Sequence, residues 1–171
     1  KLTTYNYQID GVCGKSSEKY FTNKYYDISL FKSLGLVEIL FSIPNYIRII
    51  NELSNKILAN NYDLVICVDS PDFNYQLAKK IKNNNFKKKI IQIVAPTVWA
   101  WRSGRAKKFS RVFNEIFTLF KFERKFFENQ GLKSTFIGHP ISIINEGLYN
   151  NKEKNLIAFL PGSRDNEINK L

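Results

Sequence analysis

Residues 63–83 read DLVICVDSPDFNYQLAKKIKN, and this stretch decides the fold class. Its first seven residues hold an unbroken apolar run, which is typical of a parallel strand buried on both faces. A Ser-Pro pair then interrupts the run. Between residues 74 and 83, apolar side chains recur on one helical face and lysines on the other. The pattern predicts a buried strand followed by a helix that packs on the sheet.

The same alternation continues along the chain and predicts an α/β protein built on a parallel sheet with flanking helices. Strands are expected at residues 63–69, 89–94, 115–120, 135–137 and 156–160. Helices are expected at residues 74–83, after the loop 95–101 as far as residue 110, and at 122–130, with Gly131 in the C′ position. The polar, asparagine-rich residues 145–155 are expected to link a first domain, 1–144, to the start of a second domain, 156–171.

A long apolar stripe precedes this core. Ser42 is a predicted N-cap with Pro44 in the first turn, and apolar residues then recur every three or four positions, at Ile43, Ile47, Ile50, Leu53 and Ile57. Two interpretations are open. Either the whole stripe packs inside the protein, or part of it stays exposed and docks on a membrane.

The composition is that of an ordinary globular protein: 171 residues, 44% apolar and 24% charged. No apolar run reaches the roughly 18 residues that cross a bilayer, and the polar start has no signal-peptide core, so a cytoplasmic location is expected. Because the chain begins at Lys1 and contains no methionine, we expect it to be an internal piece of a longer protein. Cys13 and Cys67 have no metal-ligand spacing, and Cys67 is predicted to be a buried, inert thiol.

The positive charge is concentrated in one segment. Residues 79–125 carry 14 lysines and arginines against two glutamates, a net charge of +12, whereas the whole chain carries +11. The remaining residues therefore sum to −1. Such a concentration of positive charge indicates an anionic partner: a nucleic acid, a phosphorylated substrate or an anionic membrane.

Ligands of open parallel sheets bind beyond the carboxyl ends of the strands, so candidate site residues are those that follow the apolar runs. These are Asp69, Asp72, Trp99, Trp101, Arg102, His139, Gly162, Ser163 and Arg164. Asp69 is the leading candidate for a general base because a carboxylate at a strand tip faces the crevice where a substrate hydroxyl binds. The alternative is that Asp69 or Asp72 only caps the following helix.

The other candidates are open to two interpretations as well. The turn 161–164 leads from a strand into a helix, so its N–H groups and Arg164 suit a diphosphate, although it lacks the ending of a P-loop. His139 has no serine or cysteine partner in the pattern, and a hydrogen bond within a turn is the favoured role for it. Trp99 and Trp101 are equally compatible with the core.

Five segments together resemble the lipid-A-disaccharide synthase family of GT-B glycosyltransferases: SLGLVEIL (33–40), DLVICVDSPDFN (63–74), APTVWAWRSGRAKK (95–108), FIGHP (136–140) and LPGSRDNEI (160–168). The resemblance implies a Rossmann-like N-terminal half that lacks its first strand and glycine-rich loop, with the second domain truncated. It also implies an inverting transfer of 2,3-diacylglucosamine from its UDP derivative to 2,3-diacylglucosamine 1-phosphate, with release of UDP and without metal or cofactor.

In that family context Asp69 is expected to be the base and Arg164 the diphosphate contact. The basic segment is expected to attract the phosphates at the cytoplasmic face of the inner membrane. The side chains that we expect to enter the lipid boundary are Val37, Leu40, Ile43 and Ile47. We also expect the 171 residues to be inactive without a complementing C-terminal half.

Two rival interpretations remain. The first is a nucleic-acid-binding module, suggested by aromatic residues interleaved with the basic ones at Trp99, Trp101, Phe109 and Phe113. The second is a decayed or split gene product without catalysis. The first is disfavoured because these aromatic residues have the spacing of core positions.

Overall fold

The computed structural model describes residues 7–31, 38–99, 104–143 and 157 of the 171-residue chain. It divides into two compact units, Lys1–Gly138 and His139–Leu171. All the strands described below belong to the first unit. The second unit contributes one described helical turn, η5 (Pro140–Ile143).

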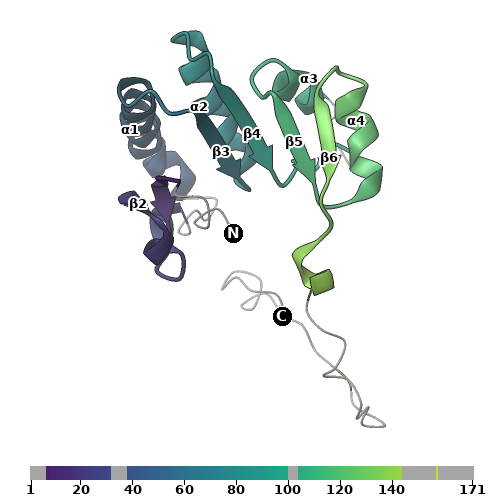
Figure 1. The fold of residues 1–171 in the computed structure, drawn as a ribbon, viewed down its shortest axis with the longest axis horizontal. Coiled ribbons are helices and arrows are strands. Elements are labelled where there is room, and N and C mark those ends of the chain that lie inside the picture. Colours follow the sequence, from purple (N-terminus) through teal and green to yellow (C-terminus); the bar gives the residue numbers. More distant parts are fainter. Residues whose placement is uncertain (1–6, 32–37, 100–103, 144–156, 158–171) are drawn as a thin grey trace. The chain divides into compact units, whose positions relative to one another are not determined.

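The first unit is built on a four-stranded parallel sheet in the order β3-β4-β5-β6 (Figure 1). The strands are β3 (Leu64–Val68), β4 (Lys89–Ile93), β5 (Glu115–Thr118) and β6 (Lys133–Phe136). They are connected by α2 (Pro71–Asn83), α3 (Gly104–Ser110) and, after the turn η4 (Lys121–Glu123), α4 (Arg124–Glu128). The predicted α/β class is confirmed, and β6 begins two residues before the predicted strand.

The sheet is covered on one face by these helices. Sequential parallel strands joined by right-handed crossovers place every connecting helix on the same side, as Figure 1 shows. That side contains the core residues Val65, Cys67, Ile90 and Ile116, which are 8% exposed or less. The other face carries apolar side chains that stay accessible.

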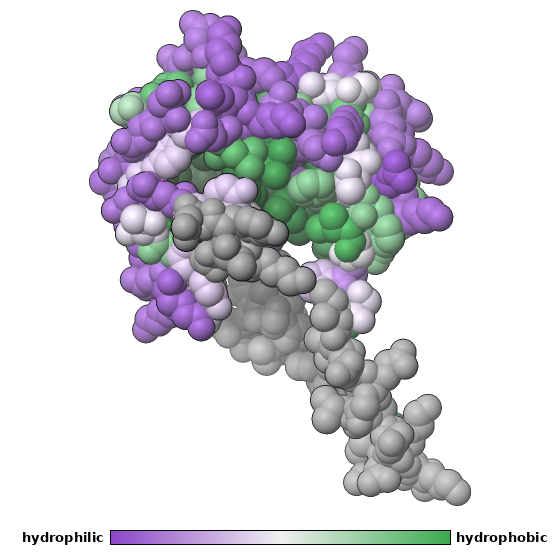
Figure 2. Space-filling model, in the orientation of Figure 1, coloured by the Kyte–Doolittle hydropathy of each residue, from purple (hydrophilic) through white to green (hydrophobic). Residues whose placement is uncertain are grey.

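The prediction that β3 is buried on both faces is therefore wrong for the part of the chain that the structure describes. Leu64, Ile66 and Val68 are 44%, 40% and 59% exposed, and alternate with the buried Val65 and Cys67. In Figure 2, apolar surface lies over the strands at the centre of the view. An apolar face of this kind is unusual for a parallel sheet, which is ordinarily covered on both sides.

The apolar stripe forms α1 (Glu38–Ala59), which packs against α2. The helix begins at Glu38 rather than after Ser42, so Pro44 lies inside it. A proline inside a helix lacks the N–H that would bond to the carbonyl four residues earlier. The helix nevertheless runs from Glu38 through Pro44 to Ala59, so the predicted helix start at Ser42 is wrong by four residues.

The stripe itself is only partly buried. The buried apolar residues of the described part of α1 are Ile49, Ile50, Leu53 and Ile57, at 9% exposure or less. Ile47 is 54% exposed. The interpretation that the whole stripe packs inside the protein is therefore contradicted at Ile47. The side chains of Leu40 and Ile43, and all of Val37, lie outside the described residues.

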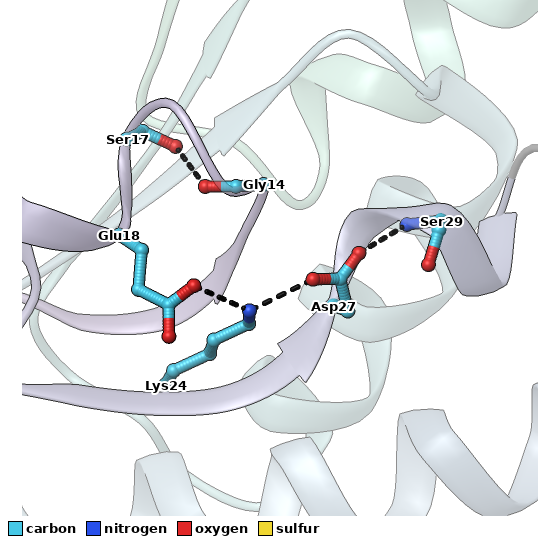
Figure 3. A network of polar contacts seen from close by, with 6 residues as sticks. All are labelled: Gly14, Ser17, Glu18, Lys24, Asp27 and Ser29. Carbon is cyan, nitrogen blue, oxygen red and sulfur yellow. Dashed lines mark hydrogen bonds and ion pairs between the residues drawn. The ribbon is translucent and has the colours of Figure 1, made fainter.

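A second, two-stranded parallel sheet precedes α1 and has no counterpart in the sequence prediction. It consists of β1 (Asp10–Cys13) and β2 (Asn23–Asp27), with helical turns η2 (Glu18–Tyr20) and η3 (Ile28–Phe31). Figure 3 shows how its loop is closed: Lys24 Nζ lies 2.8 Å from carboxylate oxygens of both Glu18 and Asp27. Hydrogen bonds from Lys24 and from the backbone and side chain of Ser29 hold the pKa of Asp27 well below its usual range.

A polar cluster attaches this small sheet to the end of α1. The Asp10 carboxylate accepts hydrogen bonds from Tyr62 Oη at 2.6 Å and from the backbone N and side-chain Nδ2 of Asn23, both at 3.0 Å. Tyr25 Oη lies 2.5 Å from Tyr62 Oη. Tyr62 stands in the loop between α1 and β3, so the cluster fixes the small sheet beside the start of β3.

Helix α4 ends at Glu128, two residues before the predicted end, but the predicted glycine C′ position is confirmed. Gly131 has φ +74° and its N–H donates to the carbonyl of Glu128, while Leu132 N–H donates to the carbonyl of Phe127. This pair of bonds is the Schellman motif, in which glycine tolerates the left-handed C′ position. Leu132 is 2% exposed and the chain passes directly into β6.

Candidate functional site

The carboxyl ends of the strands form one continuous edge. Beyond each strand the ladder gains another hydrogen bond: Asp69 N to Ile93 O at 2.9 Å, Val94 N to Phe117 O at 3.1 Å and Ile137 N to Thr118 O at 3.0 Å. The loops that leave β3, β4, β5 and β6 therefore start from neighbouring positions. The structure brings the predicted residues Asp69, Asp72 and Trp99 to this edge.

Asp69 and Asp72 have different environments although they are three residues apart. The Asp72 carboxylate pairs with the guanidinium of Arg105, whose side chain is only 16% exposed. Among the described residues, none donates a side-chain hydrogen bond to the exposed Asp69 carboxylate. The two aspartates thus differ in the described partners of their carboxylates, although both are exposed.

The capping alternative does not hold for either aspartate. Helix α2 starts at Pro71, with Ser70 in the N-cap position, and no side chain makes a capping hydrogen bond there. Asp69 and Ser70 both adopt left-handed backbone conformations, with φ +51° and +38°. Two consecutive non-glycine residues in that region are uncommon and tend to occur where the surroundings enforce them.

Two buried amides provide that enforcement and were not predicted. Gln92, fully buried in β4, donates through Nε2 to the carbonyl of Asp69 at 3.0 Å, and Asn74 Nδ2 donates to the same carbonyl. Asn74 Nδ2 also lies 3.2 Å from Gln92 Oε1. A glutamine inside the apolar run KIIQIV was the available sequence signal, because a polar side chain at a buried strand position requires internal partners.

An aromatic group stands at the ends of β4 and β5. The ring of Trp99, 50% exposed, meets Phe122 edge to face at 5.5 Å, and Phe122 stacks on Phe120 at 5.9 Å. Glu123, which follows Phe122 in the chain, is 6% exposed and accepts a hydrogen bond from Phe120 N at 3.1 Å. Burial raises the pKa of Glu123, and hydrogen bonds from Phe120, Leu119 and the Trp99 side chain partly offset that rise. Trp99 is therefore a surface residue of the site rather than a core residue.

The basic segment does not form a single patch at this edge. Helix α2 runs back from the carboxyl ends of the strands, so Lys80, Lys82 and residues 87–89 lie toward the amino ends, where β4 begins. A five-residue strand separates the two edges by roughly 16 Å. Arg105 and Lys121 follow β4 and β5 and belong to the carboxyl edge.

Part of the predicted site lies outside the described residues. This holds for Trp101, Arg102, Gly162, Ser163 and Arg164. His139 belongs to the second unit, where its Nδ1 accepts a hydrogen bond from Ile141 N at 3.2 Å and its carbonyl accepts one from Ser142. That is the turn role which the sequence favoured for it.

Both cysteines are buried, Cys13 at 3% and Cys67 at 4% exposure, and burial raises the pKa of Cys67 to about 12. Over residues 7–31, 38–99, 104–143 and 157, no three His, Cys, Asp or Glu side chains are grouped closely enough to hold a metal ion. None of the described helices combines the length and hydropathy needed to cross a bilayer.

A parallel α/β sheet with an exposed aspartate and aromatic rings at its carboxyl edge is consistent with the Rossmann-like half of a GT-B glycosyltransferase. A family model described as lipid-A-disaccharide synthetase matches residues 2–171. The chain therefore belongs to the lipid-A-disaccharide synthase family of glycosyltransferases.

Individual relatives agree with this assignment. The lipid-A-disaccharide synthase of Acinetobacter baylyi is 31% identical over 174 residues, that of Rickettsia akari 34% over 173, and that of Rickettsia conorii 38% over 135. The matches cover 96%, 95% and 78% of this chain, and 44%, 44% and 30% of the respective relatives. The chain thus spans less than half the length of these relatives.

Proposed function

We propose that these residues form the acceptor-side half of a longer lipid-A-disaccharide synthase, with Asp69 as the general base. The observation that carries this proposal is the contrast at the carboxyl edge: both aspartates are exposed, but Asp72 is paired with Arg105, whereas no described residue donates a side-chain hydrogen bond to the Asp69 carboxylate. The reaction is an inverting transfer from UDP-2,3-diacylglucosamine to 2,3-diacylglucosamine 1-phosphate. It needs no metal or cofactor in this proposal.

The chemistry is a single displacement. The 6-hydroxyl oxygen of the acceptor attacks the anomeric carbon of the donor sugar, and Asp69 takes the hydroxyl proton as the new C–O bond forms. The bond between the anomeric carbon and the diphosphate oxygen breaks with its electron pair, and UDP leaves. Arg164 in the LPGSR turn is the proposed contact of the departing diphosphate, with Gly162 and Ser163 supplying N–H groups. Trp99 and its neighbouring rings offer apolar surface to the acyl-bearing sugars.

The test compares two substitutions in the full-length protein that contains these residues. Asp69→Asn keeps the shape of the side chain but cannot accept the proton, so kcat should fall about 10²- to 10⁴-fold. Asp72→Asn, the matched control, should change kcat less than about tenfold because Asp72 is already engaged by Arg105. Circular dichroism verifies that both variants fold. Unchanged turnover in Asp69→Asn would refute the base assignment.

The 171 residues alone are proposed to be inactive, because a GT-B reaction takes place between two domains. An assay of disaccharide formation by the isolated chain tests this, and adding a separately expressed C-terminal half tests whether complementation restores activity. Product formed by the isolated chain would contradict the two-domain proposal.

We further propose that the chain contacts the anionic cytoplasmic face of the inner membrane, with Ile47 among the lipid-contacting residues. Ile47 is 54% exposed on α1, and the segment 79–125 carries a net charge of +12. The nucleic-acid alternative is weakened because Phe109 and Phe113 are each 2% exposed and stack on one another, so they are not available to bases.

Co-sedimentation with phosphatidylglycerol vesicles, neutral vesicles and random-sequence DNA over a salt series separates these cases. Preferential binding to anionic vesicles, weakened about tenfold by Ile47→Ser, supports the membrane contact. Val68→Ser is the control, since Val68 is exposed to a similar degree on a different element. DNA binding that exceeds vesicle binding and falls steeply with salt would support the nucleic-acid module instead.

A further inference from the structure

The buried amide of Gln92 joins three backbone carbonyls at the carboxyl edge. Its Nε2 lies 3.0 Å from Asp69 O, 3.0 Å from Ile93 O and 3.1 Å from Val94 O, so its two N–H groups are shared among three carbonyls. Its Oε1 accepts from Asn74 Nδ2, and Asn74 is itself 7% exposed. One side chain in β4 thereby ties the loop after β3 to the loop after β4, with the first turn of α2 as a third point of attachment.

Two of the three carbonyls that Gln92 contacts, those of Asp69 and Val94, belong to residues with a left-handed backbone, and Ser70 directly follows Asp69. Asp69, Ser70 and Val94 have φ values of +51°, +38° and +70°. A left-handed conformation is particularly unfavourable for a β-branched residue such as Val94. Such conformations persist only when the surrounding structure over-determines them, and they cluster at functional sites. The amide pair contacts both of these segments.

We propose that Gln92, assisted by Asn74, is a positioning residue for the Asp69 carboxylate; this inference rests on the proposed role of Asp69 as base. The backbone angles of Asp69 determine the direction in which its side chain leaves the main chain. Gln92 fixes those angles by holding the Asp69 carbonyl, although it does not touch the carboxylate. A misplacement of about 1 Å at a reacting group costs on the order of 10²-fold in rate, so this restraint is expected to appear in kcat.

If position 92 served only to pack the core, an apolar residue would be expected there instead of glutamine. Gln92 is fully buried beside Ile90 and Ile116 on the helix-covered face, where an apolar side chain would pack without the cost of burying an amide. Gln92 Nε2 instead contacts the carbonyls of Asp69 and Val94 in the two loops of the proposed site, and that of Ile93 at the end of β4. The polar side chain is explained by the backbone geometry that it imposes rather than by the packing that it supplies.

The experiment is a double-mutant cycle in the full-length synthase that contains these residues. Gln92→Met keeps the length of the side chain but removes its donors; it should lower kcat about 30- to 100-fold while KM stays within about threefold. The double variant Asp69→Asn/Gln92→Met should be no slower than Asp69→Asn alone, within about threefold, because a misplaced base and an absent base are equivalent. Thr118→Val is the matched control: it removes another fully buried polar group at the end of β5, and kcat should be unchanged.

The outcomes separate this inference from the proposed function. Normal kcat in Gln92→Met, or a double variant whose losses multiply, overturns the positioning role while the base assignment stands. Retained turnover in Asp69→Asn overturns the base and, with it, the positioning role. If Gln92→Met does not fold at the assay temperature, Asn74→Ala, which removes the other donor to the Asp69 carbonyl, is judged by the same kcat and KM criteria.

Discussion

The exposed face of the sheet gives a quantitative prediction about what the longer protein adds. Val68 and Val65 lie on the same strand, three residues apart, and point to opposite faces; they are 59% and 8% exposed. Replacing valine by threonine keeps the shape and exchanges a methyl group for a hydroxyl. Burying an uncompensated hydroxyl costs about 1–3 kcal/mol, whereas surface substitutions usually change stability by less than about 0.5 kcal/mol.

In the 171-residue chain, Val65→Thr should therefore lower the free energy of unfolding by about 1–3 kcal/mol and Val68→Thr by less than about 0.5 kcal/mol. In a full-length synthase, we expect further βα units to extend the sheet beyond β3 and to place their helices on the face that carries Val68. In the full-length protein, both substitutions should lower the free energy of unfolding by about 1–3 kcal/mol.

The measurement is urea unfolding followed by circular dichroism for each variant in both lengths of protein. Val65→Thr is the internal control because its side is covered by helices of the chain itself. Equal costs for the two variants in the 171-residue chain would show that the second face is already covered in solution. A negligible cost of Val68→Thr in the full-length protein would refute the coverage argument.

Two further predictions concern groups away from the site. Burial acts to raise the pKa of Asp10, but the hydrogen bonds from Tyr62 and Asn23 outweigh burial and lower the pKa. The charged Asp10 therefore stabilises the fold above about pH 4, and this contribution is lost as the pH falls through the lowered pKa. Asp10→Asn should thus lower the free energy of unfolding at pH 7 by about 1–2 kcal/mol. The free energy of unfolding of the variant, measured by urea titration, should also decline less than that of the parent chain between about pH 4 and 2. The same pH dependence in the variant and the parent chain would contradict the prediction. Cys13 and Cys67 should react with an aromatic disulfide reagent only at the rate of unfolding, whereas the thiol introduced by Val68→Cys should react at once; rapid labelling of the parent chain would show that its core opens.

Much of the sheet was predictable because its strands are short apolar runs separated by strong breaks. The run from Leu64 to Val68 ends at a Ser-Pro pair, and the helix after it ends in asparagines, one of which, Asn85, has φ +63°. These local signals predicted β3 to β6 and the helices between them to within a few residues, while the predicted strand 156–160 and the linker 145–155 lie almost wholly outside the described residues. Local signals do not show which face of the sheet is covered by helices. The exposure of Ile66 and Val68 became apparent only from the strand order and the side on which the connecting helices lie.

The small N-terminal sheet escaped prediction for a related reason. The strand Asn23–Asp27 is largely polar, and its position depends on Lys24 between two carboxylates and on hydrogen bonds to Asp10. These contacts join residues up to 52 positions apart, as between Asp10 and Tyr62. No short-range periodicity marks such an element, because tertiary contacts rather than an apolar pattern define it.

The two aspartates of the β3–α2 loop show where motif reasoning stops and structure becomes necessary. Motif reasoning made Asp69 the leading candidate for a base, but it left open whether Asp69 or Asp72 only caps the following helix. The distinction arises from Arg105, 33 residues after Asp72, which pairs with one carboxylate, and from Gln92, which fixes the backbone of the other. A general base must combine an available carboxylate with a fixed direction. The proposal that Asp69 is this base therefore depends on two residues of the next βα unit: Arg105, which pairs with Asp72, and Gln92, which holds the Asp69 main chain.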